Sequence, residues 1–337
     1  MKIFKISNKS TIYIDKPLSE LEGLLPKERV VIITDKTVFN LYKTNFPNFP
    51  TIQIGESEKS KTLKTLGSIV ESFLALGVDR SWFVLGIGGG LVCDVAGFAA
   101  SVYMRGLPFG FVATTLLAGV DASIGGKNGV NFGRFKNIIG TFTQPKFVLC
   151  DLKLLTSLPT KQIKCGYAEI IKHAIIADKE MFDILSKSEP LSLEPAKELI
   201  ERSVDIKSQI VERDEKEAGE RKKLNFGHTI GHAIENTYKL SHGLAVGFGI
   251  LIESRISFLF GYLSQSHLHQ IEALLSKNGL KLSQSVDKDV ILTNIQKDKK
   301  RHGKNLDIVV IDRVGSCFVR RVSFTEYKEA ILTVSLI

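Results

Sequence analysis

Short apolar runs rich in β-branched residues alternate with helical stretches along the first part of the chain. Such runs predict strands at residues 2–6, 11–14, 29–34, 51–54, 82–87, 109–114 and 147–150. Helical patterns lie between them, near residues 36–45, 61–76 and 90–104. Strands that are apolar throughout and alternate with helices are typical of a mainly parallel sheet covered on both faces. We therefore expect a Rossmann-like, doubly wound α/β domain over residues 1–150.

The pattern becomes mainly helical from about residue 151. Helices are predicted at residues 151–159, 165–178, 193–213, from about 227, and at 245–261, 267–277, 288–296 and 325–334. Apolar runs at 305–311 and 317–322 predict one β-hairpin. Because 337 residues exceed the usual size of a single hydrophobic core, we expect residues 151–337 to form a second, mainly α-helical domain.

The charge of the chain requires that nucleic-acid binding be weighed, since 45 basic and 36 acidic residues give a net charge of +9. The basic residues are scattered, however, and the sequence has neither an aromatic-basic platform nor a recognition-helix signature. The one dense run, residues 297–304, suits a solvated loop or a site for small phosphorylated anions. We therefore expect a small-molecule partner and no nucleic acid.

The sequence predicts neither secretion nor membrane insertion. The amino terminus alternates like a strand and lacks the apolar block of a signal peptide. The uncharged run at residues 106–120 is too short and too rich in Gly and Pro to span a bilayer. The four cysteines have no CxxC spacing, which fits reduced thiols. We expect a cytoplasmic protein without membrane contact.

Loops at the ends of the predicted strands supply the first candidate binding residues, because ligands of doubly wound sheets bind at the carboxyl ends of strands. Gly88, Gly89 and Gly90 separate a strand from a helix, so their N–H groups can approach a pyrophosphate. The run is not a GxGxxG fingerprint, since Leu91 takes the place of the third glycine. Asp35 follows another strand, where it can hold a ribose hydroxyl or cap the next helix.

Residues 114–140 form a glycine-dense stretch with no regular helical or strand period. Glycines let such a loop approach a ligand closely, and lysines give it positive charge; a purely structural loop is the alternative. Its polar residues are Thr114, Thr115, Asp121, Lys127, Lys136 and Asn137.

A histidine-rich stretch at residues 224–247 holds three of the seven histidines. On a helix, Asn225, His228, His232 and Glu235 would share one face, and His242 follows where that helix would have turned back. Imidazole is the commonest metal ligand, although a single histidine can also be a satisfied core residue. A zinc protease is disfavoured, since the residue after His228 is not the glutamate of HExxH.

A buried carboxylate is also expected on the helix GYAEIIKHA, where Glu169 and Lys172 are three residues apart. A carboxylate on an apolar helix needs a partner or a metal, so a local ion pair with the lysine is the alternative to a ligand role.

Five motifs occur in a fixed order along the chain: GGGxxxDxxGFxA at 88–100, DxSIGGKxGVN at 121–131, KNxIG at 136–140, GYAEIIK at 166–172 and LNFGHTIGHAIE at 224–235. Together they resemble the 3-dehydroquinate synthase family, a group of sugar phosphate cyclases. The resemblance implies a carbon-oxygen lyase of the shikimate pathway, active in chorismate and aromatic amino acid biosynthesis. It implies conversion of 3-deoxy-D-arabino-heptulosonate 7-phosphate to 3-dehydroquinate and phosphate, with NAD used catalytically and no net oxidation.

The resemblance also implies roles for individual residues and a homodimer. A Zn²⁺ or Co²⁺ ion would be held by Glu169, His228 and His242, with His232 beside it in proton transfer. The NAD contacts would be Asp35, Glu56, Lys59, Gly88, Gly89, Gly90, Asp94, Thr114, Thr115, Lys127, Lys136 and Ser157. The other catalytic and substrate-binding residues would be Arg105, Asp121, Lys127, Lys136, Asn137, Lys172, Lys207, Arg221, Asn225 and Lys299, the last chosen among the neighbouring lysines 297, 299 and 300.

Three departures and two rival functions accompany this interpretation. Leu244 stands where the family usually has glutamate, Cys93 stands at a common glycine position, and the loop between His232 and His242 is short. The rivals are a cyclase of another sugar phosphate and a metal-dependent NAD polyol dehydrogenase. A dehydrogenase would use the cofactor site, but it would not need the cationic group of Lys127, Lys136, Lys172, Lys207 and Arg221.

Overall fold

The computed structural model describes the chain apart from residues 134, 194–195, 283, 300–304 and 337, and of residues 297–299 it describes the backbone alone. The chain divides into two compact units. The α/β unit comprises residues 1–158 and 207–215, and the helical unit comprises residues 159–206 and 216–337. The expected fold class, an α/β domain followed by a mainly helical one, is thus confirmed; the first stretch of the α/β unit ends at Leu158, and residues 207–215 join it from further along the chain.

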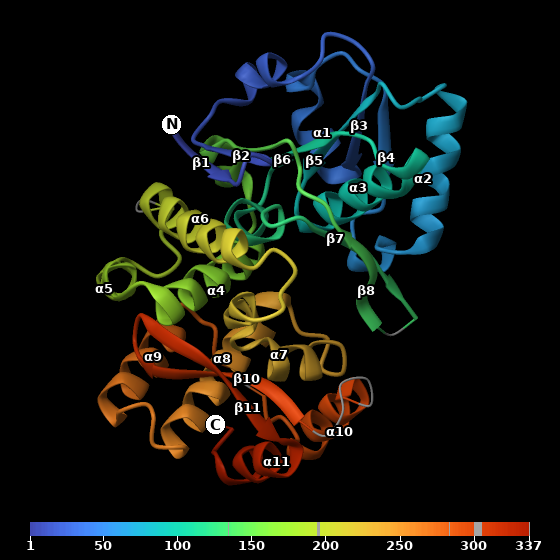
Figure 1. The fold of residues 1–337 in the computed structure, drawn as a ribbon. Coiled ribbons are helices and arrows are strands. Elements are labelled where there is room, and N and C mark those ends of the chain that lie inside the picture. The colour runs from blue at the N-terminus through green and yellow to red at the C-terminus, as the bar shows by residue number, and fades with distance from the viewer. Residues whose placement is uncertain (134, 194–195, 283, 300–304, 337) are drawn as a thin grey trace. The chain divides into compact units, whose positions relative to one another are not determined.

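A seven-stranded sheet forms the centre of the α/β unit, with the strand order β1-β2-β9-β6-β5-β3-β4 (Figure 1). Strands β1 and β2 pair antiparallel, and every other neighbour pair in this sheet is parallel. The strands are β1 (Lys2–Ile6), β2 (Ser10–Ile14), β3 (Val30–Asp35), β4 (Thr51–Ile54), β5 (Phe83–Gly88), β6 (Phe109–Ala113) and β9 (Phe147–Cys150). All seven were predicted from their apolar runs.

The connections of this sheet are helical, as predicted. They include α1 (Lys36–Tyr42), α2 (Leu63–Ala75) and α3 (Gly90–Val102). The central strands are buried on both faces, and a cluster of apolar side chains including Ile32, Leu85, Val112 and Leu149 forms the core. Burial of both faces explains why these strands are apolar throughout and show no alternation.

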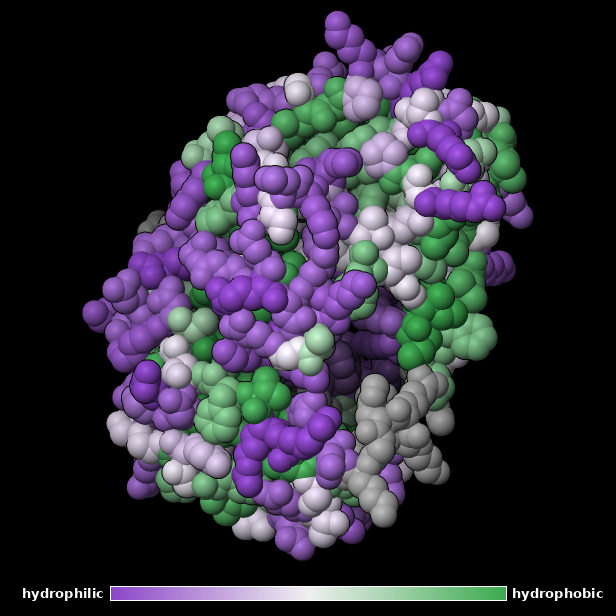
Figure 2. Space-filling model, in the orientation of Figure 1, coloured by the Kyte–Doolittle hydropathy of each residue, from purple (hydrophilic) through white to green (hydrophobic). Residues whose placement is uncertain are grey.

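The antiparallel hairpin of β7 (Lys127–Phe132) and β8 (Phe135–Phe142) in the α/β unit was not predicted. Its apolar side chains Phe132, Ile138 and Phe142 are exposed. Figure 2 shows hydrophobic residues on the side of this unit that carries α2 and β8 in Figure 1. The stretch expected to be an irregular loop is therefore a two-stranded ribbon over much of its length.

The helical unit is built from α4 (Thr160–Ala177), α5 (Lys179–Lys187), α7 (His228–Glu235), α8 (His242–Leu259), α9 (Gln265–Lys277), α10 (Lys288–Lys299) and α11 (Phe324–Thr333), with the predicted hairpin β10 (Asn305–Arg313) and β11 (Ser316–Ser323). Helix α5 was missed, and α8 begins three residues earlier than expected. By length and composition α8 could cross a membrane, yet 72% of that stretch is buried, as in the core helix of a globular domain.

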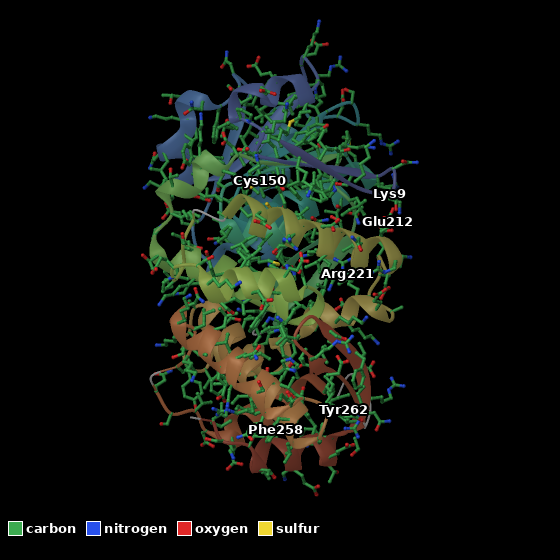
Figure 3. All side chains as sticks on the ribbon, turned by 90° about the vertical axis from the view of Figure 1, so that its left-hand side faces the viewer. Lys9, Cys150, Glu212, Arg221, Phe258 and Tyr262 are labelled. Atoms are coloured by element: carbon green, nitrogen blue, oxygen red, sulfur yellow. The ribbon has the colours of Figure 1, made fainter. Side chains whose placement is uncertain are left out.

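Helix α6 (Ala196–Arg213) belongs to both units, because its last turns and the residues after them pack with the α/β unit. The Glu212 carboxylate accepts a hydrogen bond from the Ser7 backbone N–H at 3.1 Å, and Glu215 pairs with Lys9 at 2.7 Å; Lys9 and Glu212 are labelled in Figure 3. This attachment places Lys207 with the α/β unit although the residue lies far along the chain.

Helices α7 and α8 pack backbone against backbone. Gly227 precedes α7 with φ of 80°, and a Cβ there would lie 2.6 Å from the Ile250 Cγ1 atom. Buried Glu253 of α8 accepts a hydrogen bond from the Gly227 backbone N–H at 2.7 Å. A side chain of α8 thus caps the amino terminus of α7, the end that carries His228.

The buried carboxyl of Glu253 gives a prediction about stability. Burial raises the pKa of Glu253 from 4.5 to about 8, despite backbone hydrogen bonds from Gly227 and Ile230 that lower it. At a pH between 4.5 and about 8, Glu253 therefore keeps its proton in the folded chain and has lost it in the unfolded chain. The free energy of unfolding should therefore fall as pH rises, by on the order of 1.4 kcal/mol per pH unit, and Glu253→Gln should lack this component.

Urea unfolding of wild type and Glu253→Gln at pH 5, 6, 7 and 8 measures the difference. The variant should gain stability relative to wild type as pH rises. Tyr327 is a titratable neighbour of Glu253. Its burial and the charge of Glu253 raise the pKa of Tyr327 well above its ordinary value, and the residue is present in both proteins. A difference between the two proteins that stays constant over this pH range would show that Glu253 does not titrate there.

Candidate active site

The carboxyl ends of four neighbouring parallel strands gather most of the predicted cofactor residues. Strands β6, β5, β3 and β4 are adjacent in that order, so their carboxyl ends meet at one edge of the sheet. Asp35 ends β3, Glu56 follows β4, Gly88 ends β5 and is followed by Gly89 and Gly90, and Thr114 follows β6. The Thr114 hydroxyl is buried and has no hydrogen-bond partner within the described part of the chain, as expected of a group that meets a ligand.

Asp35 performs a structural task at this edge. Its carboxylate accepts a hydrogen bond from the Val38 backbone N–H at 2.9 Å and so caps α1. Burial raises the pKa of Asp35, partly offset by hydrogen bonds from Val38 and Thr37. The Thr37 hydroxyl also donates to Glu56 at 2.9 Å, which joins the loops after β3 and β4. The capping alternative is therefore observed, and a ribose contact is compatible with it because a carboxylate accepts several hydrogen bonds.

The glycine turn after β5 has no room for side chains. A Cβ on Gly88 would lie 2.4 Å from the Val92 Cγ2 atom. Asp94, one turn into α3, forms an ion pair with Lys61, whose side chain is buried. Burial raises the pKa of Asp94 although the lysine charge lowers it. Lys61 is a residue that sequence reasoning missed, because nothing in GESEKSK separates it from Lys59.

Asp121 and Lys207, both predicted to bind substrate, meet within the α/β unit. Lys207 donates to the Asp121 carboxylate and to its backbone oxygen, each at 2.6 Å. The pair holds the lysine in one orientation, and side chains held in this way recognise anions with little loss of entropy. Lys127 begins β7, and Lys136 and Asn137 lie on β8, so the hairpin positions three more predicted residues.

Glu169, His228 and His242 converge within the helical unit. The Nε2 atom of His242 lies 2.9 Å from the Glu169 Oε1 atom, and the Nε2 atom of His228 lies 3.4 Å from the same oxygen. One donor atom of each residue lies within 4.8 Å of the others. Two imidazoles and a carboxylate are the donor set of several catalytic zinc sites, so these residues fit a divalent transition-metal ion.

The electrostatics of Glu169 suit a ligand. Burial alone would raise its pKa, but the charge of Lys172 and the hydrogen bonds of His228 and His242 outweigh burial and hold the pKa well below its usual range. Lys172, also buried, forms an ion pair with the second carboxylate oxygen. The ion-pair alternative is therefore observed, and it is compatible with a ligand role because it leaves the other carboxylate oxygen, Oε1, toward the histidines.

His232 lies beside this group, with its ring centroid 5.2 Å from that of His228 in an edge-on arrangement. The expectation that Asn225, His228, His232 and Glu235 share one helix face is wrong in part. Helix α7 begins only at His228, and Asn225 belongs to the preceding turn, η7 (Glu220–Asn225). The positive φ of Gly227 separates the two elements.

Arg221 also lies in η7, and its side chain is buried, with 2% exposure (Figure 3). The Asn225 amide donates to Glu217 at 2.5 Å. Glu217 was missed, because in the run ERDEKEAGERKK no pattern distinguishes it from the other acids. A buried guanidinium in the helical unit is a strong candidate for anion recognition.

The remaining predicted residues are placed as follows. Ser157 bonds with the Tyr42 hydroxyl at 2.5 Å, and Arg105 and Lys59 are exposed. Cys93 is buried, and burial raises the pKa of its thiol, so it is an inert replacement for glycine. Leu244 lies in the first turn of α8. The side chain of Lys299 lies outside what the structure describes.

Both units match one family. The family described as 3-dehydroquinate synthase N-terminal matches residues 51–165, and the one described as 3-dehydroquinate synthase C-terminal matches residues 166–301. A curated 3-dehydroquinate synthase from Campylobacter concisus is 39% identical over 313 residues, which are 90% of this chain and 90% of that protein.

Two solved cyclases share the fold. A 2-deoxy-scyllo-inosose synthase, complexed with carbaglucose-6-phosphate, NAD⁺ and Co²⁺, is 25% identical with a TM-score of 0.87, covering 98% of this chain and 99% of its own. A 2-epi-5-epi-valiolone synthase from Streptomyces hygroscopicus subsp. jinggangensis, with NAD⁺ and Zn²⁺ bound, is 26% identical with a TM-score of 0.85, covering 99% of this chain and 98% of its own.

Proposed function

The chain belongs to the 3-dehydroquinate synthase family, and from that premise we propose which residues carry out the NAD- and metal-dependent lyase reaction of this family. The substrate is 3-deoxy-D-arabino-heptulosonate 7-phosphate, and the products are 3-dehydroquinate and phosphate. The observation that carries the proposal is the convergence of Glu169, His228 and His242 on one point, with His232 beside them.

The rival functions are less well supported. The curated relative at 39% identity carries the synthase name, whereas the cyclases of other sugar phosphates are 25% and 26% identical. A polyol dehydrogenase needs no group of cationic side chains for a phosphorylated acid, whereas the family resemblance assigns Lys127, Lys136, Lys172, Lys207 and Arg221 of this chain to the substrate.

Glu169, His228 and His242 would hold the Zn²⁺ or Co²⁺ ion, with Lys172 keeping the glutamate ionised and fixed in direction. The ion would supply a Lewis acid for a substrate hydroxyl. His232, next to His228, would take and return protons at an imidazole nitrogen, a task for which the ordinary pKa range of histidine is suited.

The cationic residues would bind the two anionic ends of the substrate. Arg221 offers a planar fork that suits a carboxylate or phosphate, and its burial strengthens such contacts. In the α/β unit, Lys207 is oriented by Asp121, and Lys127 and Lys136 are presented by the hairpin. Asn137 and Asn225 would add neutral hydrogen bonds, and Arg105 and Lys299 would complete the set.

The edge formed by β6, β5, β3 and β4 would bind NAD, which supplies the hydride acceptor and donor. Gly88, Gly89, Gly90 and the start of α3 would receive the pyrophosphate at backbone N–H groups. Asp35 would accept the ribose hydroxyls while capping α1, and Glu56, Lys59, Asp94, Thr115 and Ser157 would line the rest. The Thr114 hydroxyl would gain the partner that it lacks among the described residues.

Asp35→Asn separates the capping role from the cofactor role, because asparagine caps a helix as well as aspartate does. Loss of a charged hydrogen bond to ribose should weaken NAD binding by about 1.5 to 3 kcal/mol, or roughly 10- to 100-fold. Fluorescence titration with NADH measures the change. Asp178→Asn is the control, since Asp178 caps α5 by accepting a hydrogen bond from the Met181 N–H in the same way. If both variants bind NADH equally tightly, Asp35 serves only as a helix cap and does not contact the cofactor.

We also propose that the protein is a cytoplasmic homodimer, as the family resemblance implies. Light scattering at micromolar concentration should give the mass of two chains, and a mass of one chain would contradict this assembly.

A further inference from the structure

A second group of metal-binding side chains lies beside the first in the helical unit. His232, Glu235 and His242 each offer one donor atom, and these atoms lie within 4.8 Å of one another. His242 belongs to this outer group and also to the inner group of Glu169 and His228. The outer group is assigned no metal by the family resemblance, which gives His232 a role in proton transfer.

The local fold explains why the outer group forms. His232 and Glu235 are three residues apart on α7, so their side chains emerge on one face. The chain then turns back, with the Leu240 N–H donating to the Glu235 carbonyl at 3.0 Å, and His242 opens α8. Gly231 allows this approach, since a Cβ there would lie 2.8 Å from the Ala245 carbonyl oxygen. Two packed helices therefore fix the positions of the three side chains.

The burial of the outer group suits a cation that arrives from solvent. The side chain of Glu235 is buried, with 8% exposure, whereas His232 is exposed. A buried carboxylate is stabilised by a cation or by donors, and two imidazoles with a carboxylate form a donor set that Zn²⁺ and Co²⁺ prefer.

We propose that His232, Glu235 and His242 form an outer site for a divalent transition-metal ion, which competes with the inner site for His242. A neutral imidazole has a single nitrogen lone pair available to a metal, so His242 can serve one ion at a time. The Nε2 atom of His242 lies 2.9 Å from Glu169 Oε1, which shows that the ring now faces the inner group. An ion in the outer site therefore requires that the inner site lose a ligand.

The competition has a consequence that rests on the proposed function. An ion in the outer site takes both His232 and His242, so excess Zn²⁺ should inhibit the enzyme. The binding claim itself is tested without substrate, so its failure and a failure of the proposed function are distinguishable.

Titration of the metal-stripped protein with Co²⁺, followed by visible absorption at constant pH, tests the outer site. Wild type should bind one ion. His228→Ala, which removes an inner ligand and leaves the outer group complete, should still bind one ion, more weakly. Adding Glu235→Gln to that variant should weaken binding by at least about tenfold, the effect of losing a charged partner.

The matched control is His228→Ala with Glu329→Gln, because Glu329 is an exposed glutamate on α11 of the same unit. It should bind Co²⁺ as tightly as His228→Ala alone. If the double variants with Glu235→Gln and with Glu329→Gln bind Co²⁺ equally tightly, Glu235 is not a ligand and the outer site is refuted. If wild type binds two ions at once, the two sites do not compete for His242. If circular dichroism shows that His228→Ala is unfolded, Glu169→Gln replaces it as the inner-site variant.

Discussion

His242→Ala is expected to leave the protein without a tightly bound divalent ion and to lower kcat/KM by at least about 10³-fold. His242 contributes to both histidine-rich groups of the helical unit, the inner group with Glu169 and His228 and the outer group with His232 and Glu235, so its removal leaves neither of these two donor sets complete. Lewis-acid activation of a hydroxyl contributes several kcal/mol to transition-state stabilisation, and each 1.4 kcal/mol corresponds to about tenfold in rate.

The metal content of the variant after gel filtration, together with its rate of phosphate release, measures this effect. His269→Ala is the control, since His269 is an exposed histidine on α9. It should retain the metal and the activity of wild type. Full metal occupancy in His242→Ala would remove that residue from the ligand set, and chelation that leaves activity intact would remove the metal from the reaction.

Arg221→Lys should cost about 1 to 3 kcal/mol in kcat/KM, roughly 5- to 150-fold, because lysine keeps the charge but loses bidentate recognition of a carboxylate or phosphate. Steady-state kinetics with thermal unfolding of the same samples separate recognition from folding. A loss in kcat/KM at a nearly unchanged Tm is the expected result.

Arg255→Lys provides a matched control for Arg221→Lys. Arg255 of α8 forms an ion pair with Glu272 at 2.7 Å, so the same substitution there should affect the Tm and leave kcat/KM unchanged. If Arg221→Lys also lowers only the Tm, its buried guanidinium is a structural group and takes no part in binding substrate.

The large sheet could be predicted from the sequence, whereas the β7–β8 hairpin could not. Strands such as β3 and β5 are buried on both faces and therefore appear as unbroken apolar runs. In the hairpin, Gly129 and Gly140 lie opposite each other, and a Cβ on Gly140 would lie 2.2 Å from the Asn128 carbonyl oxygen. Close backbone approach requires glycine there, and glycine removes the alternation that identifies a strand.

The motifs predicted Glu169, His228 and His242 as metal ligands, and the structure brings one donor atom of each within 4.8 Å of the others, but several side-chain contacts within the two units could not be predicted. Helical spacing alone would have made His232 a ligand, and the family resemblance favoured His242 instead. The structure groups Glu169 with His228 and His242. Glu253 caps α7 from a different helix, and Lys61 pairs with Asp94 from a different loop. Such partners depend on packing between distant segments, which periodicity does not report.

The assignment of helix α6 to a domain could not be predicted from the sequence either. Its amphipathic pattern predicts one helix, yet Lys207 and the residues up to 215 pack with the α/β unit. Lys207 reaches Asp121 from there. A linear division of the chain could not anticipate that a helix from the second half completes the first unit.

The stoichiometry of the reaction tests the central claim, that this chain eliminates phosphate without net oxidation. Purified protein, loaded with Zn²⁺ or Co²⁺ and NAD⁺, is mixed with 3-deoxy-D-arabino-heptulosonate 7-phosphate while phosphate and absorbance at the NADH band are followed together. One phosphate should appear for each substrate consumed, and the NADH absorbance should end at its starting value. Steady accumulation of one NADH for each substrate, with no phosphate released, would contradict the synthase assignment and establish a dehydrogenase.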